Sequence, residues 1–308
     1  MGHASLSVRT WRLNSENKSL HTIVCIKQVP DTTNVRINPE TNALIREGIP
    51  SIINPHDLHA IEEALCIKEK FGGRVSVISM CPSQGEKSLK KAISYGIDEA
   101  YLLCDRVFAG SDTLATTYVL AGAIKKLDEI EKVKLVFCGT RAIDGETGQV
   151  GPGLATRLGF SQLTYITGIS NLDINKEEIT VIRKTEGLKE KLRAPLPALI
   201  TLRDEVNEIR YSSLRDLIRA ERYKVIFWPK SMLDIDESQT GFKGSPTRVF
   251  KTYVTPTRGR GEIFGAEDGQ EKKAVDAVVE KLMETGLFVR ETAGKTEIQM
   301  DEVKESKP

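Results

Sequence analysis

The sequence has little of what several classes of protein require. Its formal net charge is +1, so no excess of one sign draws the chain to nucleic acid or to an anionic membrane. No apolar run approaches the roughly 18 residues that a membrane-spanning helix needs. The five cysteines include no CxxC pair and there are only four histidines, so we expect no disulfide framework and no metal site.

The cysteines that are present lie mostly in apolar, strand-like runs: Cys25, Cys66, Cys81, Cys104 and Cys138. An odd number of thiols in such runs indicates buried, reduced cysteines, and therefore a cytoplasmic protein. Membrane association is expected only at the periphery, through partner subunits. Residues 1–21 carry Arg9, Arg12 and Lys18 without an apolar core, so they do not form a secretory signal. A frayed tail, an upstream extension and a mitochondrial presequence stay open.

With 308 residues, 40% of them hydrophobic and 28% charged, the chain can bury a full core. Four apolar runs predict strands buried on both faces of a sheet: residues 21–27, 75–80, 101–104 and 133–138. Helical spacing between them predicts three helices: residues 57–71, 85–95 and 112–127. Asp57 is the expected N-cap of the first, and Ser111 or Asp112 that of the third. A short hairpin is expected around residues 38–41.

This alternation is typical of an α/β fold with a doubly wound, mainly parallel sheet of the Rossmann-like, adenine-nucleotide-binding type. Ligands of such sheets bind beyond the carboxyl ends of the strands. We therefore expect the chemistry in the segments that follow the strands: residues 28–31, 81–83, 105–113 and 139–152.

After residue 163 the pattern changes. Residues 179–184 and 188–193 alternate apolar and polar side chains around Glu186-Gly187 and predict a hairpin, followed by a short strand at 198–202. Later segments are a mixed stretch at 206–228, an extended arm at 229–260 and a helix at 271–285. We divide the chain into an N-terminal tail (1–21), an α/β domain (22–228) and a C-terminal arm and helix (229–308). The arm has too little apolar patterning for a core of its own, so it should bury against a partner subunit.

The most informative segment runs from Cys138 to Leu158, where a buried strand is followed by a glycine-rich turn and a helix that starts near residues 148–152. Such a turn directs backbone N–H groups and the positive end of a helix dipole at one point, which suits a phosphate. The spacing is neither that of a Walker P-loop nor that of the dinucleotide fingerprint. An ordinary strand-to-helix turn is the alternative. We expect Gly145 to be needed for backbone approach to the phosphate, and for a positive φ.

Several motifs together resemble the beta subunit of electron-transfer flavoproteins. They are Cys25-Ile-Lys-Gln-Val-Pro-Asp31, Asn54-Pro-His-Asp57 followed by Glu62-Glu63-Ala64, Val77-Ile-Ser-Met-Cys-Pro82 and, above all, Arg141-Ala-Ile-Asp-Gly-Glu-Thr-Gly-Gln-Val-Gly-Pro152. The resemblance covers roughly residues 22–220. It implies an adenine-nucleotide-binding α/β domain that pairs with an alpha subunit in a flavin-carrying heterodimer, a redox carrier rather than an enzyme active by itself.

The family has two kinds of member. In simple carriers the beta subunit holds AMP as a structural ligand. In electron-bifurcating members it holds an FAD that takes hydride from NADH and passes electrons to a low-potential, ferredoxin-type acceptor and, through the alpha-subunit FAD, to a high-potential dehydrogenase or quinone oxidoreductase. Asp144-Gly145, Gly148 to Pro152, Asp57 and residues 108–113 resemble the bifurcating kind. The AMP-binding kind stays as the alternative. A stand-alone ATP-binding stress-type protein is disfavoured, because its phosphate loop is absent.

The resemblance implies a cofactor site made by the strand ends and the loop: Cys25, Pro30, Asp31, Asn54, Asp57, Met80, Cys81, Asp112, Thr113, Gly139, Thr140, Arg141, Ala142, Asp144, Gly145, Thr147, Gly148, Gln149, Val150 and Pro152. Arg141 is the candidate catalytic residue, since a cation near flavin favours its anionic reduced state. Leu214 matches the leucine that anchors a partner dehydrogenase.

Each singled-out side chain has a plainer interpretation. Asp57 and Asp112 could serve only as helix caps, Met80 and Cys25 as core residues, Arg141 as a solvated arginine, and Leu214 as a buried leucine.

Overall fold

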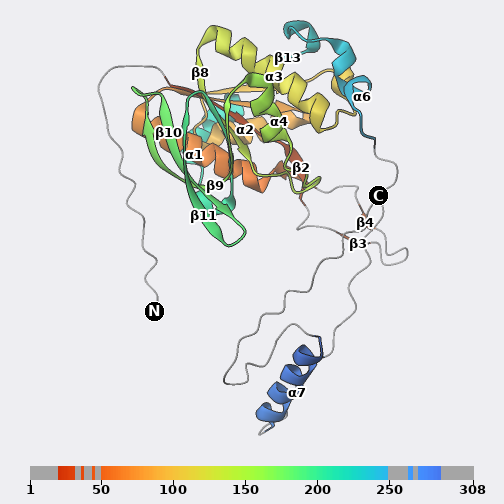
Figure 1. Cartoon of the computed structure of the whole chain (residues 1–308). Helices are drawn as coiled ribbons and strands as arrows, with labels where there is room; N and C mark the ends of the chain where they lie inside the picture. The colour runs from red at the N-terminus through yellow and green to blue at the C-terminus, as the bar shows by residue number, and fades with distance from the viewer. Residues whose placement is uncertain are drawn as a thin grey trace, which may run out of the picture. The chain divides into compact units, whose positions relative to one another are not determined.

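The computed structural model describes residues 20–31, 36–37, 44–45, 50–248, 263–265 and 270–285. The chain divides into two compact units, Met1–Lys251 and Thr252–Pro308. The first unit holds the α/β domain, in which strands and helices alternate along the chain (Figure 1).

A nine-stranded sheet forms the centre of this domain. Its strands, in chain order, are β1 (His21–Cys25), β6 (Arg74–Met80), β7 (Glu99–Leu103), β8 (Val133–Gly139), β9 (Ser161–Asp173), β10 (Glu178–Thr185), β11 (Leu188–Pro195), β12 (Ala198–Leu202) and β13 (Ile226–Trp228). Their spatial order is β11-β10-β9-β12-β8-β1-β6-β7-β13. The five central strands are parallel, and only β10 pairs antiparallel with its neighbours β9 and β11. The doubly wound, mainly parallel sheet predicted from the sequence is confirmed.

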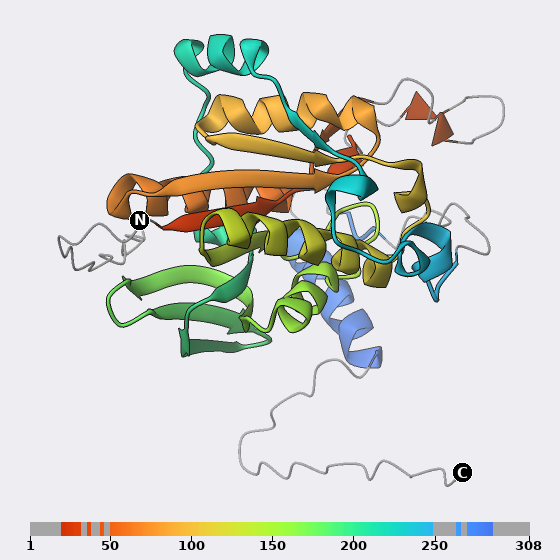
Figure 2. The same cartoon turned by 90° about the horizontal axis from the view of Figure 1, so that it is seen from above.

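Helices cover both faces of the sheet. On one face lie α1 (Pro55–Phe71), α2 (Glu86–Tyr95) and α5 (Leu214–Arg222), and on the other lie α3 (Thr113–Ile130) and α4 (Val150–Leu158). Seen from above, the sheet runs between the orange α1 and α2 and the yellow-green α3 and α4 (Figure 2). Each layer encloses its own apolar cluster, which includes Ile61 and Phe137 on the first face and Ile124 and Val136 on the second.

Capping residues mark the ends of helices α1 and α3. Helix α1 begins after Asn54, which is its N-cap, and ends at Gly72 with φ 73°. Asp57, expected as this cap, instead lies within the first turn, so that prediction was wrong. In α3, Asp112 is the N-cap, and its carboxylate accepts N–H bonds from Leu114 (2.9 Å) and Ala115 (3.0 Å).

Two segments of the sheet differ from the sequence prediction. Strand β9 was not expected, because its buried side chains recur about every third residue and Tyr165 has φ 57°. Within the mixed segment 206–228, the structure has α5 and the edge strand β13, which pairs with β7. The predicted hairpin is confirmed as β10 and β11.

Two antiparallel ribbons follow β1. In one, β2 (Gln28–Pro30) pairs with β5 (Ser51–Ile53), and in the other β3 (Arg36–Ile37) pairs with β4 (Leu44–Ile45). The pairing of β3 with β4 confirms the short hairpin expected around residues 38–41, while its connecting residues 38–43 lie outside the described part of the chain.

After β13 the chain packs against its own domain, through η5 (Lys230–Met232), η6 (Glu237–Gln239) and α6 (Gly241–Gly244). Leu233 and Ile235 are buried in the same cluster as Trp228 and the apolar face of α3. The expectation that the arm buries its apolar side chains against a partner subunit is therefore corrected for Leu233 and Ile235, whereas Met232 and Phe242 of the same segment are exposed. Residues 249–260 of the predicted arm lie outside the described part.

In the second unit the predicted helix is present as α7 (Glu271–Glu284). No helix in the described ranges combines the length and apolarity that crossing a bilayer requires. All five cysteines carry free thiols, and Cys25 and Cys138 are buried.

Candidate functional site

The start of α1 is bonded to the ends of two central strands. Asp57 is buried, and its two carboxylate oxygens accept the N–H groups of Lys27 (2.7 Å) and Gly139 (3.0 Å), which follow β1 and end β8. Asn54 accepts the N–H of Ile143 (3.2 Å) and donates its amide to the carbonyl of Arg141 (2.9 Å). Asn54 and Asp57 therefore hold the first half of the glycine-rich loop in place.

The second half of the loop exposes its backbone N–H groups. Glu146 and Gly148 have φ values of 51° and 63°, a left-handed geometry that turns successive N–H groups toward one side. Within the described part of the chain, the N–H groups of Thr147, Gly148 and Gln149 donate to no other residue. Helix α4 begins at the next residue, Val150, with Pro152 in its first turn. This arrangement can bind an anion such as a phosphate.

The positive φ expected at Gly145 is found instead at Gly148. A Cβ on Gly145 would meet nothing within 4 Å, whereas any side chain at Gly148 would be strained by the backbone angle. Gly145 and Glu146 both donate their N–H groups to the carbonyl of Ala142, which closes a turn. The loop therefore needs glycine at Gly148, and the prediction for Gly145 was wrong on this point.

The start of α3 contacts the same loop. The hydroxyl of Thr113 donates to the side-chain carbonyl of Gln149 at 2.9 Å. Asp112 caps α3 with one oxygen and accepts bonds from Thr247 with the other. Burial alone would raise the pKa of Asp112, but the donated hydrogen bonds hold it below the usual value. Asp112 therefore caps α3 and also bonds Thr247.

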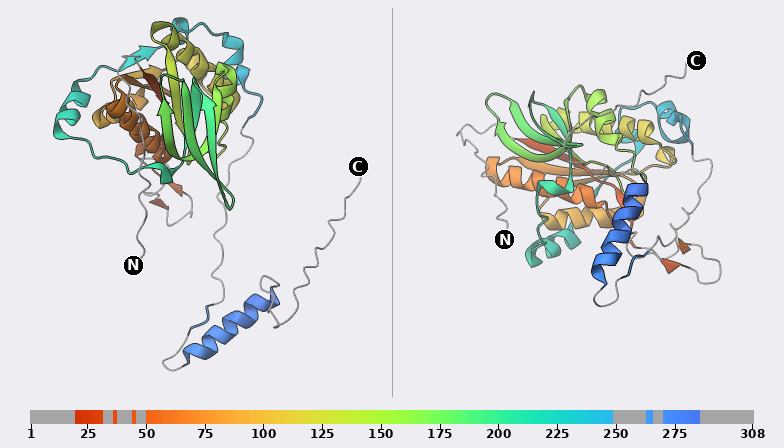
Figure 3. Two further views of the ribbon diagram at one scale, coloured as in Figure 1. Left: turned by 60° about the vertical axis from the view of Figure 1, so that its left-hand side comes forward. Right: turned by 60° about the horizontal axis from the view of Figure 1, so that its bottom comes forward.

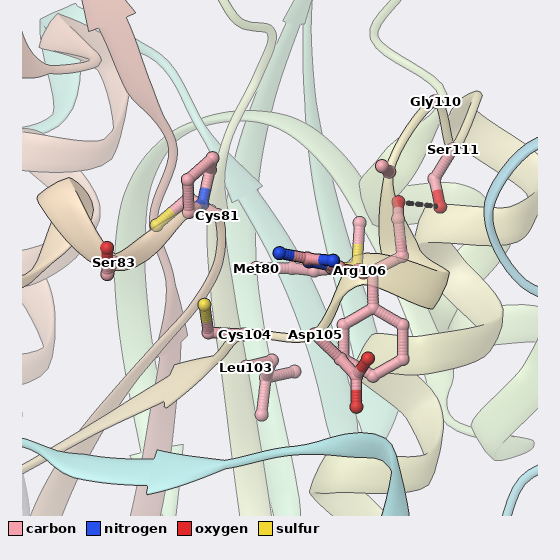
Figure 4. Close-up of a pocket in the computed structure, with 12 residues that line it drawn as sticks. Met80, Cys81, Ser83, Leu103, Cys104, Asp105, Arg106, Gly110 and Ser111 are labelled. Carbon is pink, nitrogen blue, oxygen red and sulfur yellow. Dashed lines mark hydrogen bonds between the residues drawn. The ribbon is translucent and has the colours of Figure 1, made fainter.

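A cavity of about 800 Å³ opens at the ends of β6 and β7. Met80 and Cys81, both predicted site residues, form part of its wall, and the rest comes from the segments after the two strands: Pro82, Ser83, Leu103, Cys104, Asp105, Arg106, Phe108, Ala109, Gly110 and Ser111. Figure 4 shows Cys81 and Cys104 on one side, Gly110 and Ser111 on the other, and the guanidinium of Arg106 between them. The lining is mostly apolar, as in sites that take flat, aromatic ligands.

Charged side chains surround the loop. Lys27 forms an ion pair with Asp144 at 2.7 Å, and the half-exposed Arg141 lies 3.9 Å from Glu146. The ring nitrogen Nδ1 of His56 is buried without a hydrogen-bond partner in the described part of the chain. Burial lowers the pKa of His56, and the charge of Arg141 contributes in the same direction. His56 is therefore a neutral ring with a free polar atom beside the loop.

Asp31, Cys25 and Thr140, which are also predicted site residues, contact segments other than the loop. Asp31 donates its N–H to the carbonyl of Pro50 in the ribbon that contains Pro30, not to the loop. Cys25 lies in the core of the α3 face, and Thr140 donates its hydroxyl to the carbonyl of Leu202 at 2.7 Å. The sequence reasoning missed Lys27, His56 and Arg106. The first two lie inside motifs that were singled out, but nothing in their type or spacing marked them.

Burial raises the pKa of Asp57 to about 7, although two N–H groups and the charge of Lys27 oppose this shift. A raised carboxyl pKa means that the folded state binds the proton more tightly than the unfolded state. The contribution of Asp57 to stability is therefore fully present below pH 4 and is lost as the pH rises toward 7. We expect a loss of roughly 2–4 kcal/mol across this window. Urea unfolding of the protein between pH 4 and 8, wild type against Asp57→Asn, measures this loss, and parallel pH profiles of the two proteins would refute it.

Leu214 is 75% exposed, so its interpretation as a buried core leucine is wrong. It opens α5, which lies outside α2 (Figure 3). Tyr211, Leu217 and Ile218 are also exposed, and Ala220 is the one buried residue of the helix.

Among the described residues, no group of three or more His, Cys, Asp or Glu is arranged to hold a metal ion.

The chain was compared with known proteins. The family described as "Electron transfer flavoprotein domain" matches residues 41–226. Protein FixA of Azotobacter vinelandii is 46% identical over 265 residues, 85% of this chain and 94% of that protein. The electron transfer flavoprotein subunit beta of Thermoanaerobacterium thermosaccharolyticum is 45% identical over 264 residues, 85% of this chain and 98% of that protein. The chain therefore belongs to the family of electron transfer flavoprotein beta subunits.

Proposed function

We propose that this chain is the beta subunit of an electron-bifurcating electron transfer flavoprotein and that its strand-end site binds FAD. When bound, the FAD would supply the chemistry of accepting a hydride from NADH and of giving single electrons to a low-potential, ferredoxin-type acceptor and, through the FAD of the alpha subunit, to a dehydrogenase or a quinone oxidoreductase. Membership of the family supports a flavin or nucleotide cofactor and pairing with an alpha subunit. The observation that carries the proposal is the loop with free N–H groups, which Gln149 bonds to Thr113 at the start of α3, directly after the segment that lines the apolar cavity.

The residues present fit such a cofactor. The N–H groups of Thr147, Gly148 and Gln149, together with the start of α4, would bind the pyrophosphate. The cavity beside Met80 would take a flat ring, and the unpartnered Nδ1 of His56 would offer a polar contact. FAD supplies the chemistry of accepting an electron pair and releasing single electrons. The protein supplies binding, orientation and charge.

One feature favours FAD over AMP: the loop has Asp144-Gly145 where simple carriers have a more acidic stretch. The cavity of about 800 Å³ is within the range of about 300–1,000 Å³ for drug-sized ligands, and so admits a ligand of either kind. We propose that the adenosine lies between Asn54, Asp57 and Met80. Leu214 with the exposed apolar face of α5 would dock the electron-transfer partner.

The nucleotide content of the heterodimer tests this function. We expect the chain, purified with its alpha subunit, to release two FAD molecules per heterodimer on denaturation, identified by mass spectrometry. One FAD and one AMP would instead identify the simple, non-bifurcating carrier. A beta subunit that releases neither nucleotide would reject the site itself.

Arg141 is proposed as the cation that favours the anionic, reduced cofactor. Its side chain is 51% exposed, and its backbone carbonyl is held by Asn54, so the side chain can change without disturbing the loop. Arg141→Ala should leave FAD bound, lower its midpoint potential by about 30 mV for each 1.4 kcal/mol of lost interaction, and slow NADH oxidation. Arg141→Lys should have a smaller effect. A redox titration decides: unchanged potentials and turnover would make Arg141 a solvated surface residue.

A further inference from the structure

Residues 240–247, here called the strap, lie along the outside of the cavity wall, residues 105–113. Four hydrogen bonds join the strap to residues 107–111 of the wall: Thr240 Oγ1 to the carbonyl of Val107 (3.2 Å), Phe242 N–H to the carbonyl of Ala109 (3.1 Å), Gly241 N–H to Ser111 Oγ (3.1 Å), and Ser245 Oγ to the carbonyl of Gly110 (3.2 Å). Thr240 is 1% exposed and Ser245 8%. The wall is thus fixed by a segment about 130 positions later in the chain.

The contact depends on two close approaches. A Cβ on Gly241 would overlap the carbonyl of Val107, and a Cβ on Gly110 would overlap the ring of Phe242. Both glycines also have positive φ, 56° for Gly241 and 73° for Gly110. Strap and wall therefore fit at van der Waals distance as well as through hydrogen bonds.

The strap reaches the glycine-rich loop through Asp112. Ser245 Oγ accepts the N–H of Asp112 at 2.8 Å, and Asp112 Oδ2 accepts the hydroxyl (2.8 Å) and the N–H (3.1 Å) of Thr247. The next residue, Thr113, donates its hydroxyl to Gln149 in the loop at 2.9 Å. A continuous set of hydrogen bonds thus runs from Thr247 to the segment with the free N–H groups.

We propose that the strap is a positioning element of the nucleotide site, with Thr247 and Ser245 as its positioning residues. They fix Asp112, which places Thr113 to hold Gln149 and so keeps the loop in its anion-binding geometry. Release of the bound adenine nucleotide then depends on residues that do not touch it. This inference rests on the proposed nucleotide-binding function.

The matched pair Thr247→Val and Ser238→Ala tests the inference in the heterodimer. Both exposed hydroxyls donate to a carboxylate, but Ser238 bonds Asp236 within the arm and not the wall. Loss of the Thr247 bond to a charged group should speed nucleotide release about five- to tenfold. Ser238→Ala should release at the wild-type rate, and Thr247→Ser, which keeps the hydroxyl, should restore slow release. The probe is FAD, followed by its fluorescence on dilution, or radiolabelled AMP where the wild type holds AMP.

A double-variant cycle separates positioning from general stability. In a Thr113→Val background, Thr247→Val should add no further acceleration, and the urea midpoints of the nucleotide-free heterodimers should agree between Thr247→Val and Ser238→Ala. Equal release rates for Thr247→Val and Ser238→Ala, or fully additive effects with Thr113→Val, would overturn the inference and leave the proposed function intact. A wild-type protein that holds neither FAD nor AMP would overturn both.

Discussion

Replacing Gly139 by alanine is expected to destabilise the fold by about 3 kcal/mol and to remove the bound nucleotide. Gly139 ends β8 against the start of α1, and its N–H donates to Asp57 at 3.0 Å. A methyl group there would overlap the Asp57 carboxylate and would lie 2.7 Å from the Cβ and 2.8 Å from the carbonyl carbon of His56. These groups belong to a helix packed on the sheet and cannot move aside as a flexible side chain would.

Gly145→Ala is the matched control, since it adds the same methyl group to the same loop where nothing lies within 4 Å. Urea unfolding of the two heterodimers, with nucleotide content measured on the same samples, makes the comparison. We expect a lower midpoint and loss of nucleotide for Gly139→Ala, and a midpoint near that of wild type for Gly145→Ala. Equal midpoints would show that the start of α1 is not packed against Gly139.

Removing Arg210 is the second change with a large expected effect. Its Nε and Nη2 atoms bond the two oxygens of Glu62 at 2.8 and 2.9 Å, and it also pairs with Glu69. The Glu62 side chain is only 8% exposed. Arg210→Ala would leave a buried carboxylate without its cation, which costs about 3–5 kcal/mol. The same change would release the segment that leads to α5 from its anchor on α1.

The loss should depend on pH. Burial alone would raise the pKa of Glu62, and the bonds from Arg210 hold it below the usual value. Without Arg210 the pKa of Glu62 rises, so Arg210→Ala should be less stable at pH 8 than at pH 5 when each is measured against wild type. Arg210→Lys keeps the charge but not the two-pronged contact and should be intermediate.

The control for this position is Arg215→Ala, on the exposed face of α5. Within the described part of the chain, no ion pair or hydrogen bond of the Arg215 side chain is found. Its removal should change the free energy of unfolding by less than about 0.5 kcal/mol. If both alanine variants unfold alike at pH 8, the Glu62 carboxylate does not depend on Arg210.

The sequence predicted what depends on local pattern. Strands β1, β6, β7 and β8 are mostly apolar runs, and α1, α2 and α3 show one-sided apolar spacing, so this pattern predicted the parallel sheet. The turn from a buried strand into a helix at residues 139–152 was also visible, because glycines between a buried strand and a helix are a local signal. These features need no knowledge of which distant segments meet.

What could not be predicted depends on distant contacts or on backbone angles. Asp57 reads as a helix cap until the ends of β1 and β8 are placed beside it. The strap meets the cavity wall through hydroxyls and backbone groups, which leave no periodic signal in the sequence. Gly148, and not Gly145, has the positive φ because of the path that the loop backbone takes, and the sequence alone does not determine this path.

The position of β12 has a consequence for the order of folding. In space β12 lies between β8 and β9, yet in the chain it comes after β9, β10 and β11. The three-stranded meander formed by β9, β10 and β11 can therefore assemble from local pairings, but it cannot join the central sheet until β12 has been synthesised and inserted. Contacts between segments that are far apart in the chain form slowly, so the insertion of β12 slows folding. During synthesis on the ribosome, the edge of β9 that later pairs with β12 would remain unpaired. Strand β12 is thus the last piece that turns two separately formed sheets into one.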